Sequence, residues 1–374
     1  MTNDLKPRSS GGLLNRRTFG SAAAGLAAYN LFPPAHRQAR AQERFDGKTI
    51  RILTWTDATG QAAVRNIAKP FEAATGAKVI ADLTGATSEM VAKIKASAAE
   101  PQFDIVILSG VGAIELANAG LLQKPDEGAL PNMANVIPNM RTGASGFGVG
   151  YFLYCDGLLF NTKTFSSNVP TTYEVLWDEK YKGRLFLPPP QYTEAMELTV
   201  VAAKIAGGDE RNPEPGFKLL EKLRDRVVLL ADNQAQLADL FRTNSLDVGG
   251  VYSPMLMSDF ISKPEYNLSG TLRLKEGFFY DLQFMIIPKG HPGDDAVIHA
   301  FINYALDPSV QSKMAEEVWY GPINQQATLS EKAKTSPYVV SGETVAKSGI
   351  TLDKEYLSTV RQDWIQRYTE IFGT

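Results

Sequence analysis

Hydrophobic positions between Phe45 and Gly120 follow two alternating spacings. Three short, mostly apolar runs are typical of buried strands: residues 48–55, 78–85 and 103–110. Three longer segments space their apolar residues as amphipathic helices do: residues 60–76, 88–100 and 111–120. Strands separated by helices predict βαβ units and a parallel sheet with both faces covered, with a mixed α+β layout as the alternative.

Two long extended runs interrupt this alternation. A Gly-rich segment, 141–150, leads into the apolar run 151–161, and a second such run covers 277–288. Between them we expect a helix-and-loop region at 171–183, strands at 184–188, 227–232 and 247–253, and helices at 194–206, 218–226 and 234–244. Residues 296–319 and the C-terminal tail have mainly helical patterns. The two long runs are predicted to cross between the same two lobes.

The first 41 residues have the pattern of an export signal. Arg16-Arg17 precedes a short Ala-rich apolar run, and Ala39-Arg40-Ala41 offers a cleavage site before Gln42. The arginine pair ahead of a mild apolar core resembles a Tat signal, which directs folded proteins to the periplasm, although a chance arginine pair is the alternative. The exact cleavage site stays open.

Removal of this leader makes the remaining chain clearly acidic. It leaves 32 basic and 40 acidic residues, a formal net charge of −8. The remainder has no run of lysine or arginine that would bind a phosphate backbone, so no nucleic acid partner is expected. No later apolar stretch reaches the length of a membrane helix. The single cysteine, Cys155, excludes an intramolecular disulfide.

A remainder of about 330 residues predicts more than one hydrophobic core. We expect lobe one to comprise residues 46–150 and 284–335, and lobe two to comprise 151–276. Residues 336–374 would form a C-terminal helical segment.

Several segments together resemble a known family. KTIRILTWTD (48–57) and PFEAATGAKV (70–79) match an opening strand and helix, and FDIVILSG with LANAGLLQ a third strand and its helix. LWDEKYKGRLFLP (176–188) and WYGPINQQA (319–327) match later segments. In this order they resemble the substrate-binding proteins of bacterial ABC importers, extracellular solute-binding family 1, in the spermidine/putrescine-like group.

The resemblance implies an α/β fold, the two-lobed type II periplasmic-binding-protein clamp with two crossing strands. A small solute would bind between the lobes and pass to an ABC permease in the inner membrane, and we expect a monomer without a cofactor. The ligand it favours is an amine or polyamine-like solute, with a phosphonate, thiamine, ferric iron or a carboxylate as alternatives. A sensor that uses the same clamp is not distinguished from a transporter subunit.

The candidate ligand-binding residues lie mainly where strands end, since α/β sheets bind ligands beyond the carboxyl ends of their strands. By the resemblance, an aromatic ring and polar groups contact the ligand at the first strand end, and an aromatic residue and an aspartate at the second crossing. The candidates are Trp55, Thr56, Asp57, Ser109, Gly110, Tyr151, Glu194, Asp232, Tyr252, Tyr280 and Asp281.

Some of these residues have purely structural alternatives. Trp55 could cap the core, Asp57 could cap the next helix, and Ser109-Gly110 could form a tight turn with a helix cap. Strand alternation lets only one of Tyr151 and Tyr154 face the cleft, and the sequence leaves open which one.

Two features of the sequence argue against particular ligands. Polyamine binders place acids directly after the lobe-two strand, where this chain has PPPQY (188–192) and Glu194 is the first acid. Ferric iron binders use an adjacent tyrosine pair late in the chain, which is absent here.

An exported enzyme is the alternative class. Beyond the leader only His291 and His299 remain, both near a predicted surface helix, and the turn 290–295 is a weak candidate for a metal site. Cys155 is expected to be a small buried residue, and no P-loop or GxGxxG motif follows a strand. The sequence therefore predicts neither catalytic residues nor metal ligands.

Overall fold

The computed structural model describes residues 43–340 and 342–373, which belong to one compact unit that begins at Glu43. The predicted export signal, residues 1–41, lies outside the described residues. No helix in the described part combines the length and apolar character needed to cross a bilayer.

The strands form one continuous mixed sheet. Its main order is β2-β1-β3-β11-β6-β9-β7-β8, and the shorter strands add at β6 and β11. In chain order the strands are β1 (Thr49–Trp55), β2 (Lys78–Thr84), β3 (Ile105–Leu108), β4 (Leu122–Gln123), β5 (Thr142–Gly143), β6 (Gly148–Asn161), β7 (Leu185–Leu187), β8 (Val227–Leu230), β9 (Val248–Tyr252), β10 (Leu268–Thr271), β11 (Phe278–Pro288) and β12 (Gly349–Ile350).

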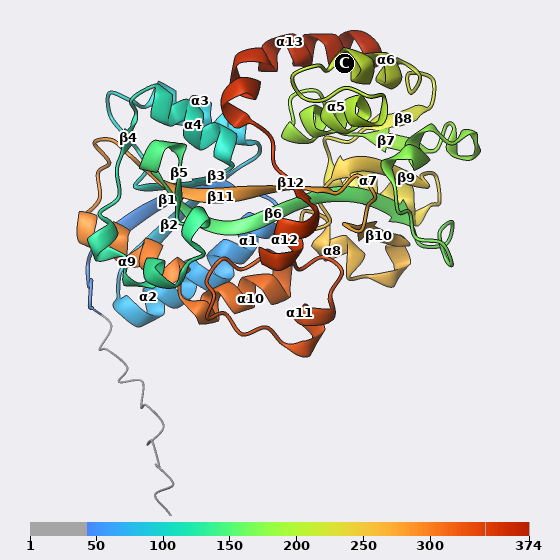
Figure 1. Cartoon of the computed structure of the whole chain (residues 1–374). Coiled ribbons are helices and arrows are strands. Elements are labelled where there is room, and N and C mark those ends of the chain that lie inside the picture. The colour runs from blue at the N-terminus through green and yellow to red at the C-terminus, as the bar shows by residue number, and fades with distance from the viewer. Residues whose placement is uncertain (1–42, 341, 374) are drawn as a thin grey trace, which may run out of the picture. The chain divides into compact units, whose positions relative to one another are not determined.

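Two long antiparallel strands connect the halves of this sheet. β6 and β11 pair from Asp156 opposite Phe279 to Gly148 opposite Ile286, and the distal part of β6 pairs with β9. The parallel prediction is correct for β2-β1-β3 and for β9-β7-β8, whereas the crossing strands are antiparallel to each other, β11 is antiparallel to β3, and β6 is antiparallel to β9. The two predicted crossings are therefore confirmed, and they make the sheet mixed (Figure 1).

Helices cover both faces of the sheet. They are α1 (Ala58–Ala63), α2 (Lys69–Thr75), α3 (Thr87–Ala96), α4 (Gly110–Asn118), α5 (Thr193–Ile205), α6 (Glu214–Glu221), α7 (Gln234–Arg242), α8 (Ser258–Ile261), α9 (Asp295–Ala305), α10 (Pro308–Val318), α11 (Glu331–Thr335), α12 (Gly342–Ser348) and α13 (Lys354–Phe372). In lobe one, α3 and α4 lie on one side of β1–β3, and α1, α2, α9 and α10 lie on the other (Figure 1).

The helix predicted over 60–76 is continuous but not uniform. A π-helical segment, Val64–Ala68, joins α1 to α2, and Gly76 ends α2 in the left-handed region at φ 77°, as a C-terminal glycine does. The predicted helix-and-loop region at 171–183 contains two short 3₁₀ segments, Tyr173–Trp177 and Glu179–Tyr181.

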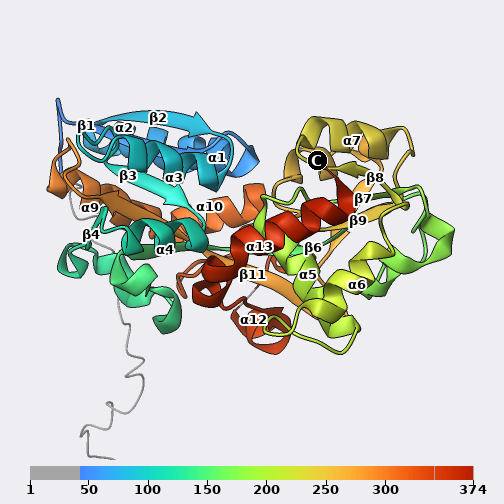
Figure 2. The ribbon, with the colours of Figure 1, turned by 90° about the horizontal axis from the view of Figure 1, so that it is seen from above.

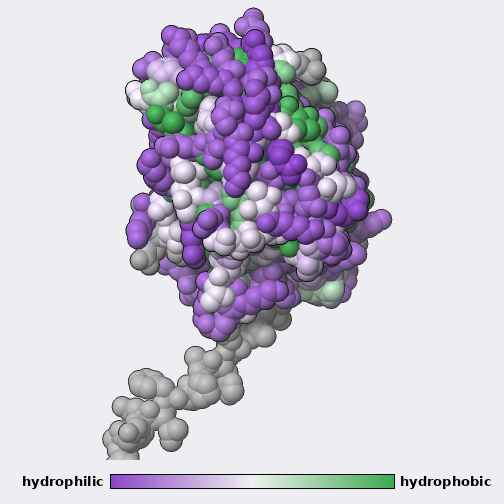
Figure 3. Space-filling view, turned by 90° about the vertical axis from the view of Figure 1, so that its right-hand side faces the viewer, coloured by the Kyte–Doolittle hydropathy of each residue, from purple (hydrophilic) through white to green (hydrophobic). Residues whose placement is uncertain are grey.

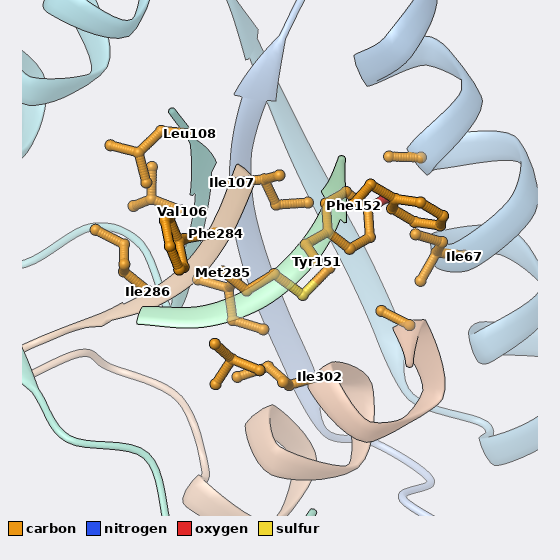
Figure 4. Packing of buried hydrophobic residues seen from close by; sticks show 14 of the residues in the cluster. Ile67, Val106, Ile107, Leu108, Tyr151, Phe152, Phe284, Met285, Ile286 and Ile302 are labelled. Atoms are coloured by element: carbon orange, nitrogen blue, oxygen red, sulfur yellow. The ribbon is translucent and has the colours of Figure 1, made fainter. Parts of the chain in front are cut away.

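Strand alternation separates the two cores of lobe two. Leu185 and Leu187 of β7 face the cluster that α5 and α6 complete, whereas Phe186 faces the cluster that includes Leu237 and Phe241 of α7. Helices therefore cover opposite faces of β7. Lobe one has a single large cluster, in which side chains of β3, β6 and β11 pack against helical residues such as Ile67 and Ile302 (Figure 4).

The C-terminal segment is part of the folded core. Leu357, Trp364 and Tyr368 of α13 are buried in the lobe-two cluster with α5 and α6, and α13 also touches α4 of lobe one. Seen from above, α13 runs from beside α4 towards α5 and α6 (Figure 2). The sequence-based domain boundaries stay a prediction, but this helix completes lobe two.

The surface carries few large apolar side chains. The face in Figure 3 is mostly hydrophilic, with small separate hydrophobic areas. Among the described residues, the exposed large hydrophobic side chains are Ile80, Val169 and Val228, which lie far apart in the sequence. Scattered apolar side chains of this kind are ordinary for a folded domain.

Replacing Trp364 tests the role of α13 in the core. Trp364 is buried and packs edge-on against Phe217 of α6, with ring centroids 5.7 Å apart. We expect Trp364→Ala to lower the free energy of unfolding by about 3–5 kcal/mol because it leaves a cavity. Urea denaturation followed by circular dichroism measures this loss. The exposed neighbour Gln362 provides the control, Gln362→Ala, and equal stability of the two variants would contradict the packing role.

Candidate functional site

A cavity of about 150 Å³ lies where the two halves of the sheet meet, beside the crossing strands. Strand ends and helix starts build its wall, as expected for an α/β sheet. Four aromatic residues line it: Trp55, Tyr154, Tyr192 and Tyr252. Six acidic residues also line it: Asp57, Asp156, Glu194, Glu197, Asp232 and Asp281. Of the described residues in the wall, Arg361 alone is a lysine or arginine.

The end of β1 brings Trp55 and Asp57 to the cavity. Asp57 also caps α1, since its Oδ1 accepts the Thr59 and Gly60 N–H groups at 2.9 and 3.0 Å. The capping alternative for Asp57 is therefore confirmed. Thr56, between the two, is exposed and lies outside the cavity wall, because neighbouring residues at a strand end point to opposite sides.

The first crossing strand, β6, presents Tyr154 and Asp156 to the cavity. The choice of Tyr151 for this position was wrong. Tyr151 is fully buried in lobe one, where its ring packs against Phe152 and Tyr320, and Figure 4 places it in that cluster. Residues two apart share a strand face, so Tyr154 and Asp156 come together and Tyr151 faces away.

In the second crossing strand, β11, residues two apart also share the face that lines the cavity. Asp281 and Gln283 line the cavity, whereas Tyr280 points to the other side, where its ring lies near Gly349 of β12. The prediction of Tyr280 was wrong, because strand alternation places Tyr280 and Asp281 on opposite faces of β11. The Gln283 side chain accepts a hydrogen bond from Tyr320 at 2.7 Å, which fixes its amide.

The start of α5 supplies two further carboxyl groups. Glu194 and Glu197 lie three residues apart, on one face of the helix, and both line the cavity. The missing acids at 188–190 therefore do not leave the site without acidic groups, because Glu194 in the first turn of α5 and Glu197 in the second supply them. Glu194 was predicted. Glu197 was missed, although its spacing from Glu194 was a usable signal.

Of the other predicted residues, three line the cavity and one does not. Ser109, Asp232 and Tyr252 line the cavity, and Asp232 lies at its exposed edge. Gly110 does not line the cavity. Its backbone N–H donates a hydrogen bond to Asp281 Oδ2 at 3.3 Å. The ligand-contacting roles of all these residues stay predictions.

Among the described residues, the inner carboxyl groups form no ion pair with a lysine, arginine or histidine. Asp156 is 2% and Glu197 3% exposed, and within the described residues Asp156 Oδ1 and Glu197 Oε2 have no hydrogen-bond partner. Burial, and then the charges of Glu197 and Glu194, hold the pKa of Asp156 well above its ordinary value. Burial, and then the charges of Glu194 and Asp281, do the same to the pKa of Glu197.

One carboxyl oxygen of Glu194 accepts a hydrogen bond from a neighbouring side chain. Its Oε1 accepts the Tyr154 hydroxyl at 3.1 Å. Burial still raises the pKa of this carboxyl, although the hydrogen bond from Tyr154 opposes the shift. The three carboxyl groups therefore favour a bound cation, which would lower their pKa values and supply the missing partners.

The histidines and the cysteine are not part of this site. His299 is buried, unlike the surface position expected, and its Nε2 accepts the Asp126 N–H at 2.8 Å. His291 also has a buried side chain, 3.2 Å from Asp295 Oδ1. Cys155 is buried, as predicted. Over residues 43–340 and 342–373, no group of three or more histidine, cysteine or acidic side chains is placed to hold a metal ion.

Removing one of the unbalanced charges tests these electrostatics. The raised pKa of Glu197 means that the folded state binds more protons than the unfolded state just above the ordinary glutamate pKa, so its contribution to stability is lost as pH rises. We expect Glu197→Gln to raise the unfolding free energy of the ligand-free protein at neutral pH by about 1–3 kcal/mol. The gain should shrink towards the ordinary glutamate pKa.

Urea denaturation at a series of pH values measures this effect. Exposed Glu221 on α6 provides the control Glu221→Gln, which should leave stability nearly unchanged. A pH-independent loss of stability in Glu197→Gln would contradict the charge imbalance.

Comparison with known proteins gives the family. Residues 66–339, more than half of the chain, match the model of the bacterial extracellular solute-binding protein family. The chain is 23% identical over 342 residues to spermidine/putrescine-binding periplasmic protein 1 of Haemophilus influenzae, covering 88% of this chain and 91% of that protein. It is 22% identical over 343 residues to a gamma-aminobutyric acid-binding protein of Pseudomonas aeruginosa, covering 85% and 89%.

Solved structures agree on the fold. The crystal structure of the spermidine/putrescine ABC transporter substrate-binding protein PotD from Streptococcus pneumoniae superposes with a TM-score of 0.69 at 21% identity, covering 87% of this chain and 99% of that one. The two-lobed clamp with two crossing strands is thereby confirmed. The related proteins named here are binding proteins that serve transport. The chain belongs to the family of bacterial extracellular solute-binding proteins, the solute-binding components of ABC transporters.

Proposed function

We propose that this solute-binding protein carries a small organic amine, held by a primary ammonium group at the carboxyls of Asp156, Glu194 and Glu197. The observation that carries the proposal is the pair of buried, unpartnered carboxylate oxygens on Asp156 and Glu197. A primary ammonium group has three N–H donors and one positive charge. It can therefore donate hydrogen bonds to the unpartnered carboxylate oxygens and neutralise a carboxylate charge.

The aromatic residues support the same ligand chemistry. Trp55, Tyr154, Tyr192 and Tyr252 surround the acidic groups, and the faces of aromatic rings attract cations. Aliphatic carbons next to an ammonium group also pack well on aromatic rings. Acidic groups alone would favour any cation, whereas the combination with aromatic walls favours an organic one.

The related proteins are consistent with an amine ligand. Their names give spermidine or putrescine for one and gamma-aminobutyric acid for another. These compounds differ in length and total charge, and they share a primary ammonium group on a flexible aliphatic chain. In the proposed site, this primary ammonium group binds at the carboxyl groups of Asp156, Glu194 and Glu197.

We also propose a periplasmic location and delivery to an ABC permease of the inner membrane, with the protein acting as a monomer and not as an enzyme. The periplasmic names of the relatives and the predicted Tat-type leader support this location. The negative charge of the exported chain and its mostly hydrophilic visible face are compatible with a freely diffusing carrier.

Neutralising Asp156 tests where the ammonium group binds. Isothermal titration of the exported chain with 4-aminobutan-1-ol and 1,4-diaminobutane should show binding of at least one compound. Asp156→Asn should weaken that binding by roughly 10- to 100-fold, the value of one charge-assisted hydrogen bond. The exposed residue Asp259 on α8 provides the control Asp259→Asn, with unchanged affinity expected. Equal affinities of the two variants would refute the position, and absence of binding to any amine would refute the proposed ligand class.

Replacing Trp55 tests the aromatic wall. Trp55→Phe keeps a ring and should keep most of the affinity, whereas Trp55→Ala should lose about 0.5–2 kcal/mol of binding free energy for the bound amine. Titration calorimetry gives the affinity, and denaturation midpoints show whether the fold is retained. If Trp55→Ala binds normally but unfolds more easily, Trp55 serves the core and not the ligand.

A further inference from the structure

One carboxyl group of the cavity already has a cation from its own chain. Lys354, the first residue of α13, forms an ion pair through Nζ with Asp281 Oδ1, and only 20% and 12% of the two side chains are exposed. The other oxygen, Asp281 Oδ2, accepts the Gly110 N–H at 3.3 Å. Both oxygens of Asp281 therefore have partners, and its charge is balanced without a ligand.

The carboxyl group of Asp156 differs from Asp281 in this respect. Both line the same cavity, and they are close in the β6–β11 ladder, where Asp281 lies opposite Tyr154 and Asp156 follows two residues later. Diagonal positions of this kind lie about 7–8 Å apart. Among the described residues, no lysine or arginine forms an ion pair with Asp156, and its Oδ1 has no partner.

The cavity therefore has two acidic positions at a separation that a short diamine could bridge, and only one of them needs a cation. The charge of Lys354 also lowers the pKa of Glu197, but it contributes less than burial, the charges of Glu194 and Asp281, and a hydrogen bond with Asp156. Among the described residues, the carboxyl groups of Asp156, Glu194 and Glu197 form no ion pair with a lysine or arginine, unlike that of Asp281.

We propose that Lys354 replaces a second ammonium group of the ligand, so that the site accepts an amine with one ammonium group and discriminates against diamines. This inference rests on the proposed function and specifies its ligand class. Lys354 is then a specificity-determining residue, supplied by the helix that also completes the core of lobe two.

The discrimination follows from the cost of placing like charges together. A second ligand ammonium beside Asp281 would lose its hydration and meet a carboxylate that is already neutralised. It would also lie near the Lys354 ammonium, and this repulsion disfavours the wrong ligand specifically. A hydroxyl or methyl group at the same end of the ligand carries neither cost.

Two probes of equal chain length test the proposal. 4-Aminobutan-1-ol has one ammonium group, and 1,4-diaminobutane has two. By titration calorimetry at neutral pH, we expect the exported chain to bind the monoamine about tenfold or more tightly than the diamine. Lys354→Met frees the Asp281 carboxylate and should reverse this preference. Lys354→Arg keeps the charge and should retain it.

A double variant and a control separate charge from structure. Lys354→Met/Asp281→Asn removes both members of the pair and should not acquire the diamine preference of the single variant. Lys313→Met removes an exposed lysine from α10 and should behave as the unchanged chain does.

The outcomes are distinct. Equal or tighter binding of the diamine by the unchanged chain would overturn the inference and leave the proposed amine function standing; this comparison needs no variant. An unchanged preference in folded Lys354→Met would overturn it as well. If none of the proteins binds either probe, the proposed function fails, and the inference fails with it.

Discussion

The burial of the Asp156 and Glu197 carboxyl groups without a cation partner is the constraint on which the candidate site depends. Buried carboxylates are stable only with hydrogen bonds or a cation, and among the described residues an oxygen of each lacks any partner. Elsewhere the same fold satisfies its buried acids. Asp104, fully buried, accepts the N–H groups of Arg51 and Gly293, and Asp247 pairs with Arg184. Under the proposed function, the cavity is therefore where stability is lost in the ligand-free protein and recovered on binding, as a carrier that binds and releases its solute requires.

Strand alternation decides which side chains reach this cavity. β6 contributes Tyr154 and Asp156, and β11 contributes Asp281 and Gln283, in each case residues two apart. The residues between them pack into the cores or against the C-terminal segment, so each crossing strand joins the lobes with one face and forms the site with the other. The binding surface is therefore built on the two strands that connect the lobes, and ligand contacts there can affect both halves of the molecule.

The sequence predicted the fold more completely than the site. Apolar runs and amphipathic spacing identified the strands and helices, and Gly76 marked the end of α2 correctly, because these features depend on local patterns. Trp55, Asp57, Ser109, Glu194, Asp232 and Tyr252 were placed near the cavity from their positions at strand and helix ends, and Asp281 from the family resemblance. Tyr151 was wrong because the face that a strand turns to the cavity depends on tertiary packing, which the sequence alone leaves open. Tyr280 was wrong because strand alternation excludes it once Asp281 is chosen. Asp156 was missed as a single acid inside an apolar strand, and Arg361 because α13 is distant in sequence and returns to the cavity only through tertiary packing.

That return of α13 links stability to specificity. Its apolar face, through Leu357, Trp364 and Tyr368, completes the core of lobe two, and this packing fixes where the first turn of the helix lies. Lys354 in that turn is consequently held against Asp281, with little of the freedom an exposed lysine would have. A cation held by a packed helix costs less conformational entropy at the moment of binding than one recruited from a loop. The segment that adds core to lobe two thus also holds a cation at one end of the cavity, and under the proposed specificity a change in its packing would alter ligand preference through Lys354.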